Sequence, residues 1–526
     1  MAYQRGENNS TSYNHPNESN LYDLHKAMQY NALGQPVLRT VGTQAVSYNS
    51  AQTTAFGEPI AVPITPVIQL DALYNFDPRE FEQFTFSTGE VESTGTLFKC
   101  HTGTGAYGYA VLRSNRIIRY RPGQGVMARF TASFENPQAD GTLRAGLFAQ
   151  EQGLNVGYDG TNFGVLRQNG GKAHIEQLTI TTPGAGNITI TLNGVVYNIA
   201  ITGSTAAENA VSISSNSFGG YITEQCDNTV TFLATSLGAQ AGVFSYTATS
   251  GGSAATFSSV QTGVNDVTNW TYQADFNVDT LDGNGPSGVL LDTTKINIFQ
   301  IQFRWLGAGI IKYSFENPDN GEMIFFHQEL FSNRNTDVHL DNPSFKIGFV
   351  AANLSANTGT DSHIAGASMM AALEGYKLDS NYSTAGSNVL TTLTNNTIHN
   401  ILTVKNRLIY QNKINLREAI LKKVSLAYQG NDPLIVYLFL DGTKSTPHEY
   451  YKIADYSCCI LDKDEGTYTL ANEHPLAEFV LPINGSAILD INELEVRIPP
   501  GSAINIAVSS TQNISRISCA AIWTEI

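Results

Sequence analysis

The stretch from Leu281 to Leu330 constrains the fold more than any other part of this chain. It contains two turn-rich segments, GAG at 307–309 and NPDNG at 317–321, between three runs in which apolar and polar residues alternate. Alternation with a period of two places the apolar side chains on one face of a strand. The positions expected on this face are Phe299, Ile301, Phe303 and Trp305, then Ile311, Tyr313 and Phe315, then Met323, Phe325 and His327. The stretch therefore predicts a β-meander with one buried face.

The composition indicates a large β-rich protein with a polar but weakly charged surface. The chain has 526 residues, which predicts two to four domains. Hydrophobic residues make up 42% of it, enough for sizeable cores, whereas only 14% of residues are charged. An average soluble protein has roughly 25% charged residues, so Ser, Thr, Asn, Gln and Gly must cover this surface. Such a surface is common in β-rich extracellular and virion proteins.

Local patterns predict a mainly β fold with two antiparallel β-sandwich domains of the jelly-roll or concanavalin-like kind. Asn193-Gly194 is a strong signal for a hairpin turn, and residues 206–213 are predicted to form a short helix. The apolar run at 434–440 predicts a strand that is buried on both faces. The predicted parts are an extended N-terminal arm (1–64), a first β-sandwich in two pieces (65–174 and 263–374), a small inserted α+β module (175–262), a linker (375–398) and a C-terminal β-sandwich (399–526).

The charge argues against nucleic acid as a partner. The net charge is −16, and phosphate neutralisation needs clustered Lys and Arg. The densest basic patch has strand-like spacing, which indicates a solvated or interface face with an acidic neighbour in an assembly. This patch consists of Arg113, Arg116, Arg119 and Arg121. No run approaches the ~18 apolar residues of a membrane span, and the first twenty residues lack the apolar core of a signal peptide.

The cysteines predict buried free thiols. Their number is odd, their spacing is wide, and no metal-binding spacing is present. This pattern is consistent with assembly in a reducing compartment. The five positions are Cys100, Cys226, Cys458, Cys459 and Cys519.

No residue is predicted to be catalytic, cofactor-binding or metal-binding, although several groups of residues have suitable chemistry. Two acidic clusters resemble the carboxylate pairs of glycan-cleaving proteins or a calcium site, but acids at turns are usually solvated. These clusters are Asp462, Asp464 and Glu465, and Asp490, Glu493 and Glu495. A third group is expected to cap turns rather than bind a cation: Asp282, Asn284 and Asp292. His327 is expected to be packed or at the surface, and Trp270 and Trp305 are expected in a core rather than on a sugar-binding surface.

Three segments carry a resemblance to a known family. They are YRPGQGVMARFTASF (120–134), GYDGTNFGVLR (157–167) and the long stretch that begins DGNGPSGVLLDTTKINIFQIQFRW (282–328). In this order they resemble structural proteins of tailed bacteriophages and of large DNA viruses of algae and protists. The likeness covers 65–374 and, more loosely, the last domain. It implies a minor capsid, vertex, fibre or tail component and no enzymatic activity or cofactor.

The expected function is therefore that of a non-enzymatic virion protein, assembled in the host cytoplasm. Its N-terminal arm and sheet faces would contact other virion proteins and further copies of itself, with a trimer preferred. The alternative is a receptor- or glycan-binding module of the particle, because sandwich loops bind sugars. A glycan-degrading enzyme is a remote alternative, since it would need two carboxylates about 5–10 Å apart in a groove.

Overall fold

The computed structural model describes residues 28–30, 36–39, 45–47, 62–265, 267–356, 359–375, 382–389, 393–470, 474–514 and 516–526. The chain divides into two compact units, Met1–Pro63 and Ile64–Ile526. In the first unit a small antiparallel sheet consists of β1 (Met28–Tyr30), β2 (Pro36–Arg39) and β3 (Ala45–Ser47). The sequence predicted an extended arm over 1–64 and not these strands, and most of that arm lies outside the described residues.

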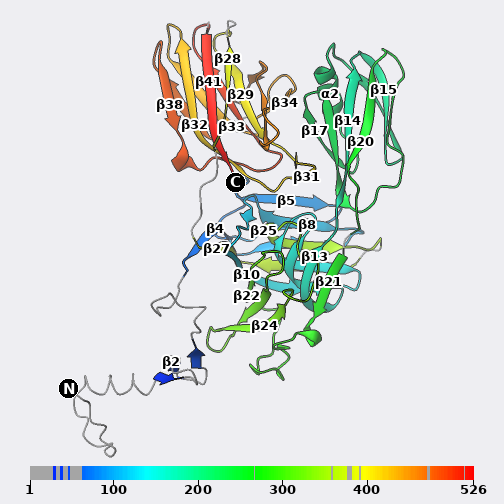
Figure 1. Ribbon diagram of the computed structural model, residues 1–526, viewed down its shortest axis with the longest axis vertical. Helices are drawn as coiled ribbons and strands as arrows, with labels where there is room; N and C mark the ends of the chain where they lie inside the picture. The colour runs from blue at the N-terminus through cyan, green and yellow to red at the C-terminus, as the bar shows by residue number, and fades with distance from the viewer. Residues whose placement is uncertain are drawn as a thin grey trace, which may run out of the picture. The chain divides into compact units, whose positions relative to one another are not determined.

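The second unit begins with a β-sandwich of two antiparallel sheets (Figure 1). The first sheet contains β24 (Met323–Glu329), β23 (Ile311–Glu316), β22 (Asn297–Phe303), β10 (Gly125–Glu135), β26 (His363–Gly366), β7 (Phe98–His101) and β6 (Glu90–Ser93), with β27 (Ser368–Glu374) pairing β10 and β4 (Ile64–Asp71). The second contains β21 (Val267–Tyr272), β13 (Asn162–Asn169), β12 (Gly153–Asp159), β11 (Gly141–Phe148), β25 (Ser344–Asn353), β8 (Tyr109–Ser114) and β5 (Phe81–Phe86), with β9 (Ile118–Arg119) beside β25.

The predicted meander forms one edge of this sandwich. In β22 and β23, Phe299 lies opposite Phe315 and Ile301 opposite Tyr313, and all four side chains are buried in the core between the sheets. The indole of Trp305 packs against this core, and its Nε1 donates to the carbonyl of Leu340 at 2.8 Å. Both the meander and the core position of Trp305 are confirmed.

In the third strand of the meander, the predicted core position of Phe325 is wrong. The pairing of β23 with β24 shifts between Tyr313 and Ser314, so that His327 faces Tyr313 and Phe325 faces Ser314. This bulge leaves Phe326 between the paired positions and buries it completely, whereas Phe325 is only half-buried. An extra residue reverses the alternation beyond it, which is why Phe326 occupies the core position predicted for Phe325.

Residues 173–261 form a module with two small sheets and one helix. Its sheets are β17 (Tyr221–Cys226), β18 (Thr229–Leu237), β14 (Ala173–Thr182) and β20 (Ala254–Gln261), and β16 (Val195–Ile201), β15 (Gly186–Leu192) and β19 (Ser245–Ala248). The predicted hairpin is confirmed, because Asn193 and Gly194 have φ of +49° and +84° between β15 and β16. The predicted helix is confirmed as α2 (Ala206–Ser214), which begins with a capping box of Thr205 and Glu208.

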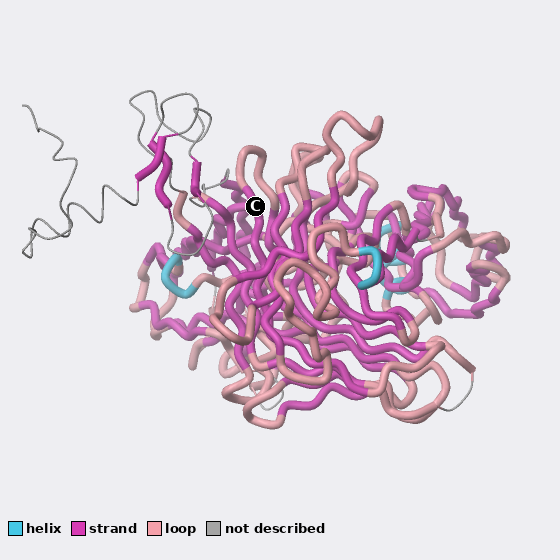
Figure 2. Tube along the Cα trace, turned by 90° about the horizontal axis from the view of Figure 1, so that it is seen from below, coloured by secondary structure: helices cyan, strands magenta, loops and turns pink. Residues whose placement is uncertain are grey.

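The C-terminal part is a second sandwich, and Figure 2 shows strands throughout both sandwiches. One sheet contains β28 (Tyr382–Val389), β41 (Arg516–Glu525), β32 (Ala419–Gln429) and β38 (Ser486–Asp490), with β39 (Arg497–Ile498) beside β32. The other contains β34 (Tyr451–Lys452), β35 (Cys459–Asp462), β29 (Ile398–Asn406), β40 (Ala503–Ser509), β33 (Leu434–Leu440) and β37 (Ala477–Leu481), with β36 (Thr467–Tyr468) beside β29. The remaining elements are the hairpin of β30 (Ile409–Tyr410) and β31 (Lys413–Ile414) and the 3₁₀ turns η2 (Gln273–Asp275) and η3 (Asn492–Leu494).

Strand β33 is buried on both faces, as its apolar run predicted. Val436 and Leu438 lie in the core between the two sheets, and Tyr437 and Phe439 lie in a smaller cluster on the other face. Within the described residues, no helix has the length and apolar character that a membrane crossing requires.

The predicted linker over 375–398 is wrong in part. Tyr382–Val389 forms β28, which pairs with β41 along its whole length, from Tyr382 opposite Thr524 to Val389 opposite Ile517. Small polar residues such as Ser383 and Gly386 gave this segment the composition of a loop. Main-chain hydrogen bonds nevertheless build an edge strand without large side chains, because each residue provides a donor and an acceptor.

Buried acids join the parts of the second unit. Glu224, on β17 of the module, accepts a hydrogen bond from the N–H of Leu408 at 2.8 Å and lies 3.6 Å from the guanidinium of Arg407. Glu418, beside β32, accepts one from the N–H of Ile117 at 2.8 Å, in the first sandwich. Both carboxylates are almost inaccessible to solvent. All five cysteines are buried and free, which confirms that prediction.

Candidate functional site

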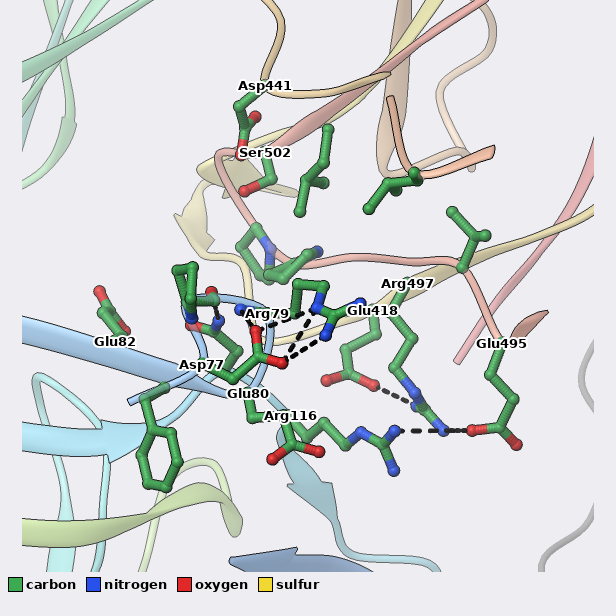
Figure 3. Close-up of a pocket in the computed structure, with 18 of the residues that line it drawn as sticks. Asp77, Arg79, Glu80, Glu82, Arg116, Glu418, Asp441, Glu495, Arg497 and Ser502 are labelled. Carbon is green, nitrogen blue, oxygen red and sulfur yellow. Dashed lines mark hydrogen bonds and ion pairs between the residues drawn. The ribbon is translucent and has the colours of Figure 1, made fainter. Parts of the chain in front are cut away.

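A cavity of about 660 Å³ lies between the two sandwiches, and the arginines in its lining are engaged in ion pairs (Figure 3). Arg497 contacts Glu418 at 2.9 Å and Glu495 at 3.1 Å. Arg79 pairs with Asp77 at 2.6 Å. Because these charges neutralise one another, the cavity offers few free groups to a charged ligand.

The predicted basic patch has its acidic neighbours within the same chain. Arg113 pairs with Glu82 at 2.9 Å, and Arg116 lies 3.8 Å from Glu495. Burial alone would raise the pKa of Glu82, but the charges of Lys346 and Arg113 outweigh it and lower that pKa to about 2. These two arginines therefore need no acidic partner from another subunit.

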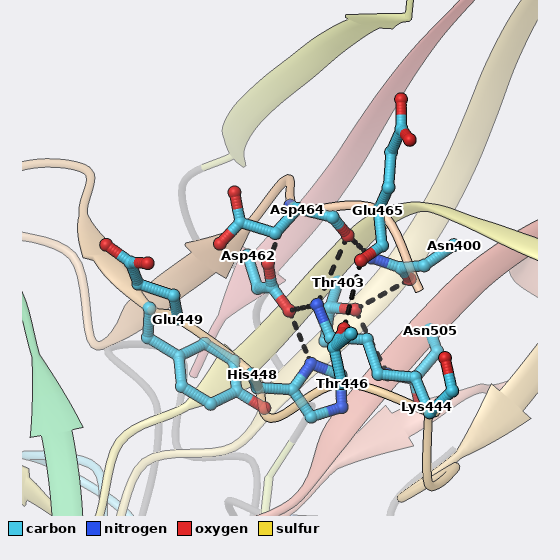
Figure 4. Close-up of polar contacts among 12 residues, drawn as sticks. Asn400, Thr403, Lys444, Thr446, His448, Glu449, Asp462, Asp464, Glu465 and Asn505 are labelled. Atoms are coloured by element: carbon cyan, nitrogen blue, oxygen red, sulfur yellow. Dashed lines mark hydrogen bonds and ion pairs between the residues drawn. The ribbon is translucent and has the colours of Figure 1, made fainter. Parts of the chain in front are cut away.

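Asp462 is the centre of a buried polar cluster in the C-terminal sandwich (Figure 4). Its Oδ2 lies 2.6 Å from Lys444 Nζ and 2.5 Å from His448 Nδ1. Its Oδ1 accepts a hydrogen bond from the N–H of Asp464 at 2.7 Å. Neither Asp462 nor Lys444 has any exposed side-chain surface. The carboxylate is therefore paired with the Lys444 ammonium, and Lys444 and His448 occupy the positions that a calcium ion would need.

A chain of buried amides and hydroxyls continues from this cluster. Asn400 Nδ2 donates to the carbonyl of Asp464 at 2.9 Å, and its Oδ1 accepts from Thr403 at 3.0 Å. Asn505 Nδ2 donates to the same hydroxyl at 3.0 Å. A satisfied buried network of this kind specifies one packing arrangement, so the cluster has a structural role.

The three acids predicted to cluster at this turn do not act as one site. Burial and the negative charges of Asp462 and Glu449 raise the pKa of Asp464 to about 6. Glu465 is exposed, and Figure 4 shows its carboxylate pointing away from that of Asp462. In the second predicted cluster Asp490 lies 3.4 Å from Lys423 and caps the N–H of Asn492.

The acidic residues near 282 cap turns, as expected. Asp282 Oδ1 accepts hydrogen bonds from the N–H of Asn284 at 2.9 Å and from the hydroxyl of Thr280 at 2.7 Å. Asp292 Oδ1 accepts one from the N–H of Thr294 at 3.0 Å. His327 is also packed as expected, and burial lowers its pKa to about 4.

The outer face of the sheet that contains β11, β12, β13 and β21 is a better candidate for ligand binding. Leu143, Ala145 and Leu147 of β11 point into the core, so the alternating residues Arg144 and Gly146 point outward. The strand pairing places the following residues together on this surface, called the Trp270 face below: Arg144, Gly146, Asn155, Gly157, Asp159, Gly164, Leu166, Gln168, Trp270 and Tyr272.

Glycines leave the middle of the Trp270 face without side chains, although their main chain is itself buried. Gly146 has φ of +146°, and a Cβ there would lie 2.4 Å from the carbonyl oxygen of Leu154. A Cβ at Gly157 would lie 1.9 Å from the carbonyl oxygen of Leu143. No larger residue fits these positions without moving the backbone, so the fold itself keeps this area free of side chains.

An aromatic ring crosses the edge of this face at β13. Trp270 and Tyr272 are both partly exposed on the edge strand β21. The hydroxyl of Tyr272 donates to Asp159 Oδ2, at 2.8 Å, on β12. Since β13 separates these two strands, the ring must cross β13, and Gly164, which is paired with Tyr272, has no side chain in its way. One side of the ring therefore rests on the sheet and the other faces outward.

Asn155 presents unused hydrogen-bonding groups beneath this face. Its side chain is 1% exposed, and within the described residues neither amide atom has a hydrogen-bond partner. Arg144 Nη1 donates to Gln168 Oε1 at 3.1 Å, and because Asn155 lies between these two residues in the sheet, the arginine passes over it. An unpaired buried amide is costly.

Sequence reasoning placed Trp270 in the core and missed Tyr272, Asp159 and Asn155. Trp270 is instead partly exposed on the outer face. The available signal was the spacing of Gly157 and Gly164, which are paired on neighbouring strands and remove side chains from one face. The contact of Tyr272 with Asp159 depends on the insertion of 173–261 between their strands and cannot be derived locally.

No family model and no curated protein matches the chain. Among solved structures, the carbohydrate recognition domain of Emp47p has 9% identity and a TM-score of 0.25, and covers 63% of this chain and 100% of its own. Arcelin-5, a lectin-like defense protein from Phaseolus vulgaris, has 9% identity and a TM-score of 0.22, with 59% and 98% covered. Lectin UEA-II complexed with galactose has 11% identity and a TM-score of 0.22, with 59% and 100% covered. These similarities are too low to support an inference about this chain.

Proposed function

We propose that this chain binds a glycan on the Trp270 face without cleaving it. The observation that carries the proposal is the partly exposed ring of Tyr272, which crosses β13 at Gly164 and is held by Asp159. Aromatic rings present flat apolar surfaces, and sugar rings present C–H groups on the faces between their hydroxyls. A ring fixed in place loses little entropy when a ligand stacks on it.

Polar groups around the ring match the hydroxyls of a sugar. Asp159 has acceptor capacity beyond its bond to Tyr272, Arg144 has several donors, and the amide of Asn155 can both donate and accept. A mostly apolar surface with a few convergent polar groups is the usual composition of a small-ligand site.

The acids of this sheet favour binding over hydrolysis. Glycoside hydrolysis uses two carboxylates at most about 9.5 Å apart, one of which must hold a proton. The outward-facing acids on the described strands of this sheet are Asp159 on β12 and Glu82 on β5, four strand positions apart. At about 4.8 Å per strand that separation is about 19 Å. In addition, the low pKa of Glu82 keeps it ionised at neutral pH.

Binding of the full chain to a glycan array, followed by calorimetry on the best ligand, tests the proposal. Trp270→Ala and Tyr272→Ala should each weaken binding at least about tenfold, which corresponds to about 1.4 kcal/mol. Phe86→Ala is the matched control, because Phe86 is 60% exposed on β5, at the other end of the same sheet. Absence of binding by the unchanged protein, or equal affinity in all variants, would refute it.

We also propose that the glycan-binding chain is a component of a virus particle. The support is the resemblance of residues 120–134, 157–167 and 282–328 to virion structural proteins. In this setting the N-terminal arm would attach the chain to other virion proteins or to further copies of itself. A weakly charged surface suits wide polar contacts of this kind.

A further inference from the structure

Two histidines far apart in the sequence are neighbours on the first sandwich. His101 on β7 and His363 on β26 are directly paired across the strands. Their ring centroids lie 4.8 Å apart, and the rings are stacked with an interplanar angle of 29°. Cys100 and Ile364, the residues next to them, point into the core, so both imidazoles lie on the outer face of their sheet.

An aspartate completes a group of three potential ligands. Asp361 Oδ2 lies 2.8 Å from His101 Nδ1, and its Oδ1 accepts a hydrogen bond from the N–H of Gly103 at 2.9 Å. The second bond holds the carboxylate in position and leaves the other oxygen directed at the histidine. Metal-binding carboxylates are commonly oriented by such outer hydrogen bonds.

Further carboxylates surround the pair. Glu92 Oε2 lies 3.4 Å from His101 Nε2, and Glu135 Oε2 lies 3.4 Å from His363 Nε2. The remaining ring nitrogen, Nδ1 of His363, is buried and has no hydrogen-bond partner within the described residues. A buried imidazole nitrogen without a partner is unusual in a folded protein.

We propose that His101, His363 and Asp361 bind a divalent transition-metal ion of the zinc class. One ligand atom from each residue lies within 4.8 Å of the others. Zinc–ligand bonds of about 2.0–2.2 Å place tetrahedral ligands about 3.4 Å apart, so small side-chain rotations close the gap. Two imidazoles with a carboxylate select zinc over calcium and magnesium, which take oxygen ligands.

The ion would fasten a loop end to the sheet. His101 and His363 belong to strands β7 and β26, whereas Asp361 precedes β26 and contacts Gly103 after β7. A metal at this point therefore links the ends of both strands and adds its binding free energy to the stability of the fold. Glu92 or Glu135 is close enough to provide a fourth ligand.

Equilibrium dialysis of the full chain against ZnCl₂ tests the proposal, with any affinity tag removed and the protein first treated with EDTA. One zinc ion should bind per chain, and zinc should raise the melting temperature. His363→Ala and Asp361→Asn should each weaken binding about 10- to 100-fold. The Asn variant retains the oxygen that accepts from Gly103 and thus preserves the loop. His474→Ala, at an exposed histidine, should leave binding unchanged.

X-ray absorption locates the ion independently of these variants. The proposed site predicts a shell of nitrogen and oxygen at about 2.0–2.2 Å and no sulfur at about 2.3 Å. A sulfur shell would overturn the proposal, because it would place the ion at the other cluster of potential ligands, Cys458, Cys459 and Glu525. Failure of the unchanged protein to bind zinc at 100-fold excess, or equal affinity in the His363 and Asp361 variants, would also overturn it. Glycan binding by the Trp270 face, on the other sheet, is expected to be independent of this result.

Discussion

Replacing Lys444 by methionine should destabilise the C-terminal sandwich strongly. Lys444 Nζ lies 2.6 Å from Asp462 Oδ2, and neither side chain has exposed surface. Methionine retains most of the length and the apolar character of the lysine stem, so the change chiefly removes the charge and its hydrogen bonds. The Asp462 carboxylate then remains buried with less compensation.

The expected loss follows from the partners that Asp462 keeps. Breaking a buried ion pair by removing one partner costs about 3–5 kcal/mol. His448 Nδ1 and the N–H of Asp464 still contact the carboxylate, at 2.5 and 2.7 Å. We therefore expect the lower end of this range, about 3 kcal/mol in the free energy of unfolding.

Urea unfolding measures the loss in the free energy of unfolding. Hydrogen exchange of β29 and β35 then locates this loss, because these strands flank the cluster. Lys463→Met is the matched control, since Lys463 is adjacent in sequence to Asp462 but exposed. A loss below about 1 kcal/mol in Lys444→Met would refute the reasoning, because that is the value of an exposed ion pair.

A double-mutant cycle separates the pair from other effects of the substitutions. Asp462→Asn removes the negative charge and retains an oxygen for the N–H of Asp464. If Lys444 and Asp462 interact as described, the double variant should be more stable than the sum of the single losses predicts, by about 1–3 kcal/mol. Strict additivity would show that the two charges are not coupled.

Two other changes test separate parts of the chain. The pKa of Asp464 is raised to about 6, so the stability that is present below its unfolded pKa is lost as the pH rises through 6 and the carboxyl ionises in the folded protein. Asp464→Asn removes this charge and should therefore stabilise the protein at pH 8, by about 1–2 kcal/mol after allowance for partial solvent exposure. At pH 3 and below, Asp464 is protonated in both the folded and the unfolded protein, so the variant and the unchanged protein should have the same melting temperature. A larger gain in stability at pH 3 than at pH 8 would contradict the raised pKa of Asp464. Deletion of residues 2–50 should leave the melting curve of the 64–526 unit unchanged but abolish incorporation into particles, and normal incorporation would refute the arm as an attachment.

Features that depend on neighbouring residues could be predicted from the sequence. The hairpin at Asn193-Gly194 needs two consecutive residues with positive φ, and both have it, at +49° and +84°. The meander follows from alternation within 297–316, where the pairing of Phe299 with Phe315 has no irregularity. In each case the turn and the strands are within a few residues of each other, so no distant contact decides the outcome.

Features that depend on a partner strand could not be predicted in this way. The bulge that buries Phe326 arises where Tyr313 and Ser314 change register with β24. The polar segment 382–389 becomes a strand because β41, more than a hundred residues later, offers a free edge. Propensity and periodicity describe one strand at a time, whereas the partner decides its register.

Some of the few charged residues of this chain are buried, which its composition did not predict. With 14% charged residues, polar uncharged residues were expected on the surface, but some of the scarce charges are inside. Glu224, Glu418 and Asp462 are almost inaccessible, and each accepts a backbone N–H and faces a cationic side chain.

Charges placed in this way favour one arrangement of the chain's parts. A buried carboxylate that loses its partners costs several kcal/mol, so any packing of the module or the sandwiches that separates these pairs is penalised. Hydrophobic contacts lack this selectivity, because they tolerate small shifts. An isolated acid within a β-rich run, such as Glu224 in YITEQC, is therefore a sequence signal for a docking contact, and its position on β17 shows which strand makes that contact.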